Sequence, residues 1–172
     1  MQTPNPGEKA TPVMAYTSNM LVRGEVITRE SVRVSIWLRT EGAPRYIRIT
    51  KAQILMMNGA VPRPMTYPEI IIPADQVVAF HPLPPTVEQL DYEENEKNRV
   101  NSPIELLAGS FLIKCKVRLS TQTDLLNTLD VSHAPWYSIY DLSVSHPALP
   151  QMAVSSFMGL VRPNAVTFCF LP

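Results

Sequence analysis

Apolar and polar residues alternate along several short stretches of the chain, which is the pattern of strands with one buried face. The clearest stretch is residues 31–40, where every second residue from Val32 to Leu38 is apolar. A Gly-Ala-Pro turn follows, and residues 45–55 again alternate. The sequence predicts further short strands over residues 21–28, 70–72, 76–81, 106–113, 115–120, 136–144, 157–162 and 165–170.

The second part of the chain repeats features of the first. Val-Arg-Val-Ser begins at Val32, and Val-Arg-Leu-Ser begins at Val117 at the same distance from a preceding glycine, Gly24 or Gly109. Residues 136–144 also match residues 46–54, and residues 166–168 match residues 78–80. The pattern predicts an internal duplication in which Gly24 corresponds to Gly109.

The predicted fold is all-β, with two tandem small barrels of five antiparallel strands each. Short strands that are bent at a glycine suit such a barrel, and a two-layer sandwich made from both halves is the alternative. Thr123 and Asp124 suit the start of a short helix, which would be an insertion in the second barrel. The predicted organisation is a flexible N-terminal tail, a first repeat, an acidic solvated linker and a second repeat, over residues 1–20, 21–83, 84–103 and 104–172.

Residues 117–127 and 136–144 carry a resemblance. They combine a strand that ends in Arg-Leu-Ser, a short Asp-x-x-Asn segment and an aromatic–Asp–Leu strand. In this they resemble bacterial small-β-barrel proteins and are loosely similar to Sm-like barrels. The resemblance implies a fold and no activity. Sm proteins carry an Arg-Gly pair before the last strand, and Arg162-Pro163 stands near that place here, which argues against their RNA-binding pocket.

The composition agrees with a folded β protein, and it also bears on the partners and the cellular location that we expect. Seventeen prolines and six glycines favour short strands and fixed turns over long helices. The formal net charge is zero, so charge alone does not indicate a nucleic-acid partner. The two cysteines make no disulfide framework, and no apolar run approaches the length of a membrane span. Prolines and charges near the N-terminus do not fit an export signal, so we expect a cytoplasmic protein without a membrane partner.

The sequence offers no catalytic, cofactor-binding or metal-binding residue. His81, His133 and His146 form no zinc-type pair with each other or with cysteine at ligand spacing. Nucleophile elbows, phosphate-binding loops and dinucleotide fingerprints are absent from the sequence. We therefore expect no enzyme and no cofactor.

One cluster of side chains indicates an interaction face. If residues 31–40 and 45–55 pair as strands, cations and aromatic residues alternate on their polar side. Such a face suits a protein interface, self-association or an internal seam, and it also suits stacking on single-stranded nucleic acid. The predicted function is a non-enzymatic protein-interaction or scaffolding module, with an Sm-like nucleic-acid-binding protein as the alternative. The residues of the face are Arg33, Trp37, Arg39, Tyr46 and Arg48.

Overall fold

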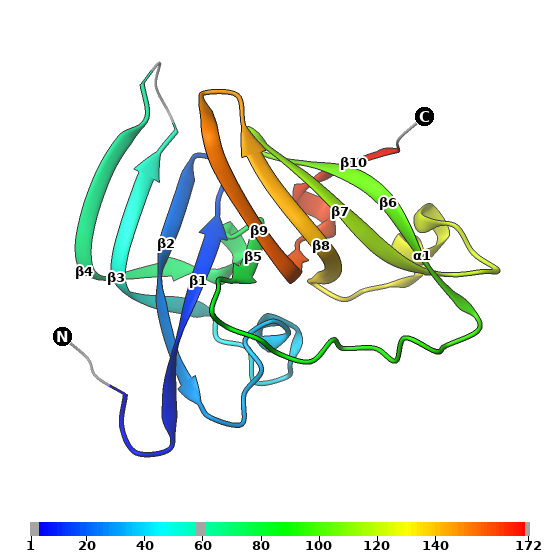
Figure 1. The fold of residues 1–172 in the computed structure, drawn as a ribbon, viewed down its shortest axis with the longest axis horizontal. Coiled ribbons are helices and arrows are strands. Elements are labelled where there is room, and N and C mark those ends of the chain that lie inside the picture. The colour runs from blue at the N-terminus through cyan, green and yellow to red at the C-terminus, as the bar shows by residue number, and fades with distance from the viewer. Residues whose placement is uncertain (1–3, 58–60, 171–172) are drawn as a thin grey trace.

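The computed structural model describes residues 4–57 and 61–170, which form one antiparallel sheet of ten strands (Figure 1). The strand order is β10-β6-β7-β8-β9-β5-β1-β2-β3-β4, so the sheet is open and its edge strands are β10 and β4. The all-β prediction is confirmed. None of the helices in the described ranges is long and apolar enough to cross a membrane. The strands are β1 (Glu8–Tyr16), β2 (Met20–Arg29), β3 (Tyr46–Met56), β4 (Arg63–Pro73), β5 (Ala79–Pro82), β6 (Arg99–Ala108), β7 (Phe111–Ser120), β8 (Tyr137–His146), β9 (Leu149–Val161) and β10 (Thr167–Phe170).

Strands β1–β5 and β6–β10 follow the same order of elements. In each set four consecutive strands pair as neighbours, and the fifth strand pairs with the first. A helical segment follows the second strand, η1 (Trp37–Arg39) or α1 (Leu125–Val131). A 3₁₀ turn precedes the fifth strand, η2 (Ala74–Gln76) or η3 (Pro163–Ala165). A register shift also occurs at the same place in both sets, after Arg23 in β2 and after Lys114 in β7.

The repeat register predicted from the glycines is wrong. Gly24 lies inside β2, whereas Gly109 lies in the turn between β6 and β7 with φ of +61°. In the structure Gly109 precedes the second strand of its set by a short turn, as Ser18 does in the first set. The other two matches agree with the strand order, because they relate β3 to β8 and β5 to β10.

Residues 31–40 form a turn and η1 instead of the predicted strand. The buried apolar side chains are Val34 and Leu38, four positions apart, which is the spacing of a helical turn, and Ser35 is buried beside Val34. Ile36 and Trp37 are half-buried, so the alternation seen in the sequence does not correspond to one inner and one outer face. A period of two and a period of four cannot be separated over so few residues.

The predicted flexible tail over residues 1–20 is wrong for residues 8–16, which form β1 in the middle of the sheet, while residues 1–3 lie outside the described residues. Val13 and Ala15 belong to one hydrophobic core, whereas Met14 and Tyr16 belong to the other. Successive side chains of a strand point to opposite faces, so β1 is buried on both faces. This explains why its sequence lacks the alternation of a surface strand.

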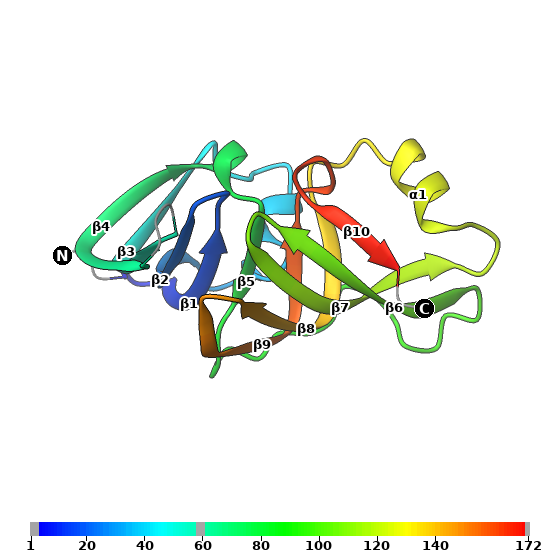
Figure 2. The ribbon, with the colours of Figure 1, turned by 90° about the horizontal axis from the view of Figure 1, so that it is seen from above.

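The two cores therefore lie on opposite faces of the middle strands. Phe80 of β5 and Leu160 of β9 belong to the core of β1–β4, and Ala79 and Val161 belong to the core of β6–β10. Each core thus contains side chains from both parts of the chain, and Trp136 lies in the core of β1–β4. The middle strands β9, β5 and β1 hold the two parts together (Figure 2).

Several predicted loops and boundaries need correction as well. Much of the two predicted loops, 56–68 and 145–155, is strand instead, because residues 63–68 lie in β4 and residues 149–155 lie in β9, while residues 58–60 lie outside the described residues. The predicted linker, residues 84–103, ends earlier, because β6 begins at Arg99. The short helix is confirmed as α1, but Asp124 is its N-cap and accepts a hydrogen bond of 2.8 Å from the backbone N–H of Asn127.

Candidate interaction site

The five residues of the predicted face do not form one platform. Arg33 donates to the backbone oxygens of Gln89 and Leu90 in the linker, each at 3.4 Å. The Trp37 ring is half-buried and lies 6.4 Å from the Phe80 ring, between ring centroids. The strand pair on which the prediction rested is replaced by η1, so Arg33 and Trp37 face the linker and the first core.

Tyr46 and Arg48 lie elsewhere, on β3 beside the edge strand β4. The Tyr46 side chain is 63% exposed, and the residue is paired in register with Pro73 of β4. Arg48 lies 3.6 Å from Glu69 of β4, measured between Nε and Oε1. These two residues remain candidates for an interaction surface, because they lie on the strand next to the edge of the sheet.

The linker, predicted to be a solvated connector, is attached through three of its acidic residues, Glu88, Asp91 and Glu96. Both carboxylate oxygens of Glu88 accept hydrogen bonds of 2.8 Å, from the backbone N–H groups of Val34 and Ser35. Asp91 accepts from Arg39, from the Ser138 hydroxyl at 2.9 Å and from the Tyr140 hydroxyl at 2.7 Å. Since Arg39 precedes β3 and Ser138 lies in β8, Asp91 joins the two parts of the chain.

The Asp91 network has a measurable effect on Tyr140. Burial and the hydrogen bond to the Asp91 carboxylate both raise the pKa of the Tyr140 hydroxyl above its ordinary value. The hydroxyl therefore stays protonated and remains a hydrogen-bond donor throughout the physiological range. Arg39 also donates to the Ser138 hydroxyl, so it contacts both Asp91 and β8.

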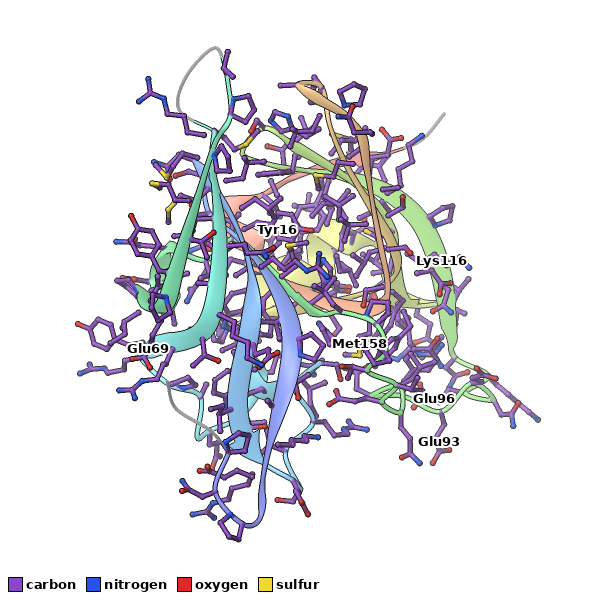
Figure 3. All side chains as sticks on the ribbon, turned by 60° about the vertical axis from the view of Figure 1, so that its left-hand side comes forward. Tyr16, Glu69, Glu93, Glu96, Lys116 and Met158 are labelled. Carbon is purple, nitrogen blue, oxygen red and sulfur yellow. The ribbon has the colours of Figure 1, made fainter. Side chains whose placement is uncertain are left out.

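A pocket of about 310 Å³ lies between the linker, β7 and β8. Arg118 packs against it with its guanidinium carbon 4.0 Å from the centroid of the Tyr92 ring, and it pairs with Glu96 at 3.0 Å. The Nε atom of Arg118 is buried and has no hydrogen-bond partner among the described residues. Figure 3 shows Glu93 and Glu96 together on this linker, on the other side of the view from Glu69. Arg39 and Arg99 also line the pocket, so cationic and aromatic groups gather here.

Two sheet edges stay unpaired within the described residues, and they lie at opposite ends of the strand order (Figure 2). On β4, Ile71 is 55% exposed and Tyr67 is also exposed. On β10, Phe170 is 70% exposed. An edge strand presents free backbone N–H and C=O groups to which another strand can pair. Pro64 and Pro68 interrupt the donors of β4, so Glu69–Ile72 is its longest stretch without proline.

The internal junction between β5 and β9 shows how such edges meet in this fold. Ala79 pairs with Val161, and Phe80 pairs with Leu160. The Arg162 backbone N–H extends the junction by donating to the Val78 oxygen at 2.9 Å. Its guanidinium donates to the Ala74 oxygen from Nη2 at 2.9 Å and lies over the Trp136 ring at 4.7 Å. The two parts of the chain are therefore joined by a strand pair and by one arginine.

A buried polar pair lies close to this junction. The Tyr16 hydroxyl lies 2.9 Å from Nε2 of His81, and Nδ1 of His81 lies 2.9 Å from the Pro82 oxygen. Nδ1 must carry the proton to bond a carbonyl oxygen, so Nε2 accepts from Tyr16. Burial lowers the pKa of His81 to about 4 and raises the pKa of Tyr16. Both groups are neutral and have their hydrogen-bond partners, so the pair stabilises the fold and needs no further role.

The described residues contain no group of three or more histidine, cysteine or acidic side chains that could hold a metal ion. Comparison with known proteins yields no family model, no curated protein and no solved structure that matches this chain.

Sequence reasoning missed Glu88, Asp91 and Arg118. A signal for the first two existed, because Val87, Leu90 and Tyr92 flank them, whereas Glu94 and Glu96 have only polar neighbours. An acidic residue among apolar ones in a linker indicates that this part of the linker packs. No comparable signal marks Arg118, because its partners Tyr92 and Glu96 are far from it in the sequence.

Proposed function

We propose that this chain is a non-enzymatic protein-interaction or scaffolding module of the cytoplasm, which binds partner protein along its unpaired sheet edges. The observation that carries the proposal is the pair of open edges, each with an exposed apolar side chain, Ile71 or Phe170. Strand addition to such an edge gives affinity through backbone hydrogen bonds and specificity through alternate side chains.

We further propose that the chain arose by duplication of one five-stranded unit of the Sm-like kind. The shared order of elements supports this, and so does a detail of the second and third strands of each unit. Lys51 in β3 and Asp141 in β8 both have positive φ, of 50° and 49°, next to the shared register shift. A non-glycine residue with positive φ is uncommon, so its occurrence at matching positions supports a common origin.

The β4 edge is the more suitable docking strand of the two. Ile70, Ile71 and Ile72 are β-branched and favour extended backbone, and they continue a ladder of eleven residues. Natural proteins protect long edges with proline, and here the prolines protect only the first part of β4. The unprotected part lies beside Tyr46 and Arg48, residue types that are enriched at protein interfaces.

The test compares two substitutions of exposed apolar residues. Ile71→Lys places a charge on the β4 edge, whereas Leu126→Lys places the same charge on α1, where Leu126 is exposed. Affinity purification of the native protein should recover a protein partner with the wild type and Leu126→Lys that Ile71→Lys loses. A partner recovered equally by all three, or enzymatic turnover by the purified protein, would contradict the proposal.

The second candidate function is binding of single-stranded nucleic acid, and the pocket beside Arg118 is the observation that favours it. Three arginines and several tyrosines line this pocket, and such groups bind phosphates and stack on bases. Fluorescence anisotropy with short single-stranded DNA and RNA at low and physiological salt tests it. We expect weak binding, because Asp91 and Glu96 already pair with Arg39 and Arg118. Submicromolar binding at physiological salt that Arg99→Ala weakens would favour this candidate instead.

A further inference from the structure

We propose that the partner at these edges is a second copy of this chain, whose β4 pairs with β10 in the way that β9 pairs with β5 inside one chain. The inference rests on the proposed function, because it names the partner of the same edges. It follows from the strand order. The internal junction joins β5, the fifth strand of the first set, to β9, the fourth strand of the second set. The unpaired edges are the other fourth strand, β4, and the other fifth strand, β10.

The residue pairs of the new junction follow from the existing pairs. The registers of β1 with β5 and of β6 with β10 align Phe80 with Phe168 and Ala79 with Thr167. The registers of β3 with β4 and of β8 with β9 align Leu160 with Ile71 and Val161 with Ile72. Phe80 pairs with Leu160, and Ala79 pairs with Val161. The structure therefore assigns two intermolecular pairs, Phe168 with Ile71 and Thr167 with Ile72.

Side-chain sizes at the next position support this assignment. In the internal junction a Cβ atom at Gly159 would lie 2.8 Å from Cδ2 of Leu142, 3.1 Å from Cβ of His81 and 3.2 Å from the backbone oxygen of Phe80. The corresponding residue of β4 is Ile70, which is far larger. One neighbour is smaller in compensation, because Ala52 corresponds to Leu142 and has no Cδ atom, whereas Cys169, which corresponds to His81, keeps its Cβ atom. The new junction therefore lacks the shortest of these contacts, and the other two must widen by a few tenths of an ångström to admit Ile70.

One difference makes the new junction weaker than the internal one. Pro73 stands where Arg162 stands in the other set, and proline has no backbone N–H. The hydrogen bond that Arg162 donates to Val78 thus has no counterpart, and neither has the contact between its guanidinium and Trp136. We expect an association that is reversible and depends on concentration.

The two edges do not pair with each other within one chain, because they lie at opposite ends of the strand order, and Figure 2 shows β4 and β10 on different sides of the middle strands. Pairing β4 of one copy with β10 of the next is a heterologous contact, which generates a ring if the rotation closes and a filament if it does not. Each copy would add its ten strands to a continuous sheet. The assembly should therefore contain more than two copies at saturation.

A disulfide tests the register directly. The assigned register places Ile70 of one copy opposite Cys169 of the next, and directly opposed residues of an antiparallel pair lie within disulfide distance. In the Ile70→Cys variant, oxidised glutathione should convert the two thiols into a disulfide between copies, while the glutathione is reduced. Non-reducing gel electrophoresis should then show a ladder of dimers and larger species. Cys169→Ser added to Ile70→Cys should abolish the ladder.

Glu69→Cys is the matched control, because a shift of one residue turns the thiol to the other face of the strand and should reduce crosslinking at least tenfold. Light scattering over a concentration series of the wild type should show growth beyond the monomer, and Ile71→Lys should prevent that growth while Leu126→Lys does not. A wild type that stays monomeric at high concentration, or equal crosslinking of Glu69→Cys, would overturn the inference. If Ile71→Lys still abolished recovery of a different protein, the proposed function would stand without self-association.

Discussion

At the scale of single residues, the register shift in β2 depends on a glycine. A Cβ atom at Gly24 would lie 2.4 Å from Cγ2 of Ile49 and 2.6 Å from the backbone oxygen of Thr50. The oxygen cannot move without disturbing the pairing of β2 with β3. The glycine is therefore required by close packing of neighbouring backbone, and not by an unusual φ.

We expect Gly24→Ala to lower the free energy of unfolding by about 1–3 kcal/mol, the usual cost of forcing extra atoms into a packed interior. Gly42→Ala is the control, because nothing lies within 4 Å of a Cβ atom at that position. Urea unfolding of both variants measures the difference. Equal stability of the two variants would show that β2 and β3 can separate at no cost.

The buried His81 should make stability depend on pH. Burial lowers the pKa of His81 in the folded state to about 4, compared with an ordinary value of 6.5. Between these values the unfolded chain binds a proton that the folded chain does not, so stability is complete above pH 6.5 and falls as the pH drops toward 4. The expected loss is about 3 kcal/mol. Burial also lowers the pKa of His146, which acts in the same direction.

Thermal unfolding between pH 4 and pH 7 checks this dependence. His81→Phe should flatten the curve over that range, although it also removes the acceptor of the Tyr16 hydroxyl and lowers stability at pH 7. His133→Ala is the control, because His133 is exposed and lies outside the buried pair. An unchanged slope in His81→Phe would assign the pH dependence to other groups.

At the scale of elements, the linker acts as a strap and not as a spacer. The Asp91 side chain is only 9% exposed and accepts hydrogen bonds from the hydroxyls of β8, while Arg39 approaches it from the other part of the chain. We expect Asp91→Ala to lower the free energy of unfolding by about 2–4 kcal/mol, because it leaves the Arg39 guanidinium without its carboxylate partner and the Tyr140 hydroxyl without its acceptor. It should also expose the linker to protease.

Glu94→Ala is the matched control on the same linker, since Glu94 is exposed. Its effect should stay within about 0.5 kcal/mol, as for ordinary surface substitutions. Limited proteolysis followed by mass spectrometry locates the cuts. Equal cutting of both variants near Asp91 would contradict the role of Asp91 in holding the linker.

At this scale, alternation in the sequence correctly predicts strands that have one wet face. Residues 45–55 and 136–144 alternate clearly, and both are strands, β3 and β8. Strand β1 was missed because both its faces are buried and because prolines and polar residues precede it. The prediction of the interaction face was wrong for a related reason. Arg33 lies in a turn and Arg39 lies in η1, and both side chains bind linker residues that are more than fifty positions away. Local pattern does not show which distant segment covers a residue.

At the scale of the whole molecule, the two parts depend on each other for their cores. Tyr16 of β1 is fully buried in the core of β6–β10, where its ring meets the Phe111 ring edge-on at 5.0 Å. Leu160 of β9 and Trp136 are buried in the other core. Equal length and a repeated pattern indicated two units, and the small size of each favoured packing between them, but the sequence did not show which residues each unit supplies to the other.

We therefore expect residues 99–172 expressed alone not to form a cooperative domain. The fragment contains β6–β10 but lacks the side chains that β1, β2 and the segment around β5 place in its core, and it leaves β9 without its partner β5. A unit of this size has little spare apolar area to lose. Circular dichroism during thermal unfolding should show no sharp transition. Adding a fragment of residues 1–98 should restore one, because it returns the missing strand partner and the missing core residues. A sharp transition in residues 99–172 alone would mean that the second unit folds without the first. The shared core would then result from joining two complete units and would not be a condition of their folding.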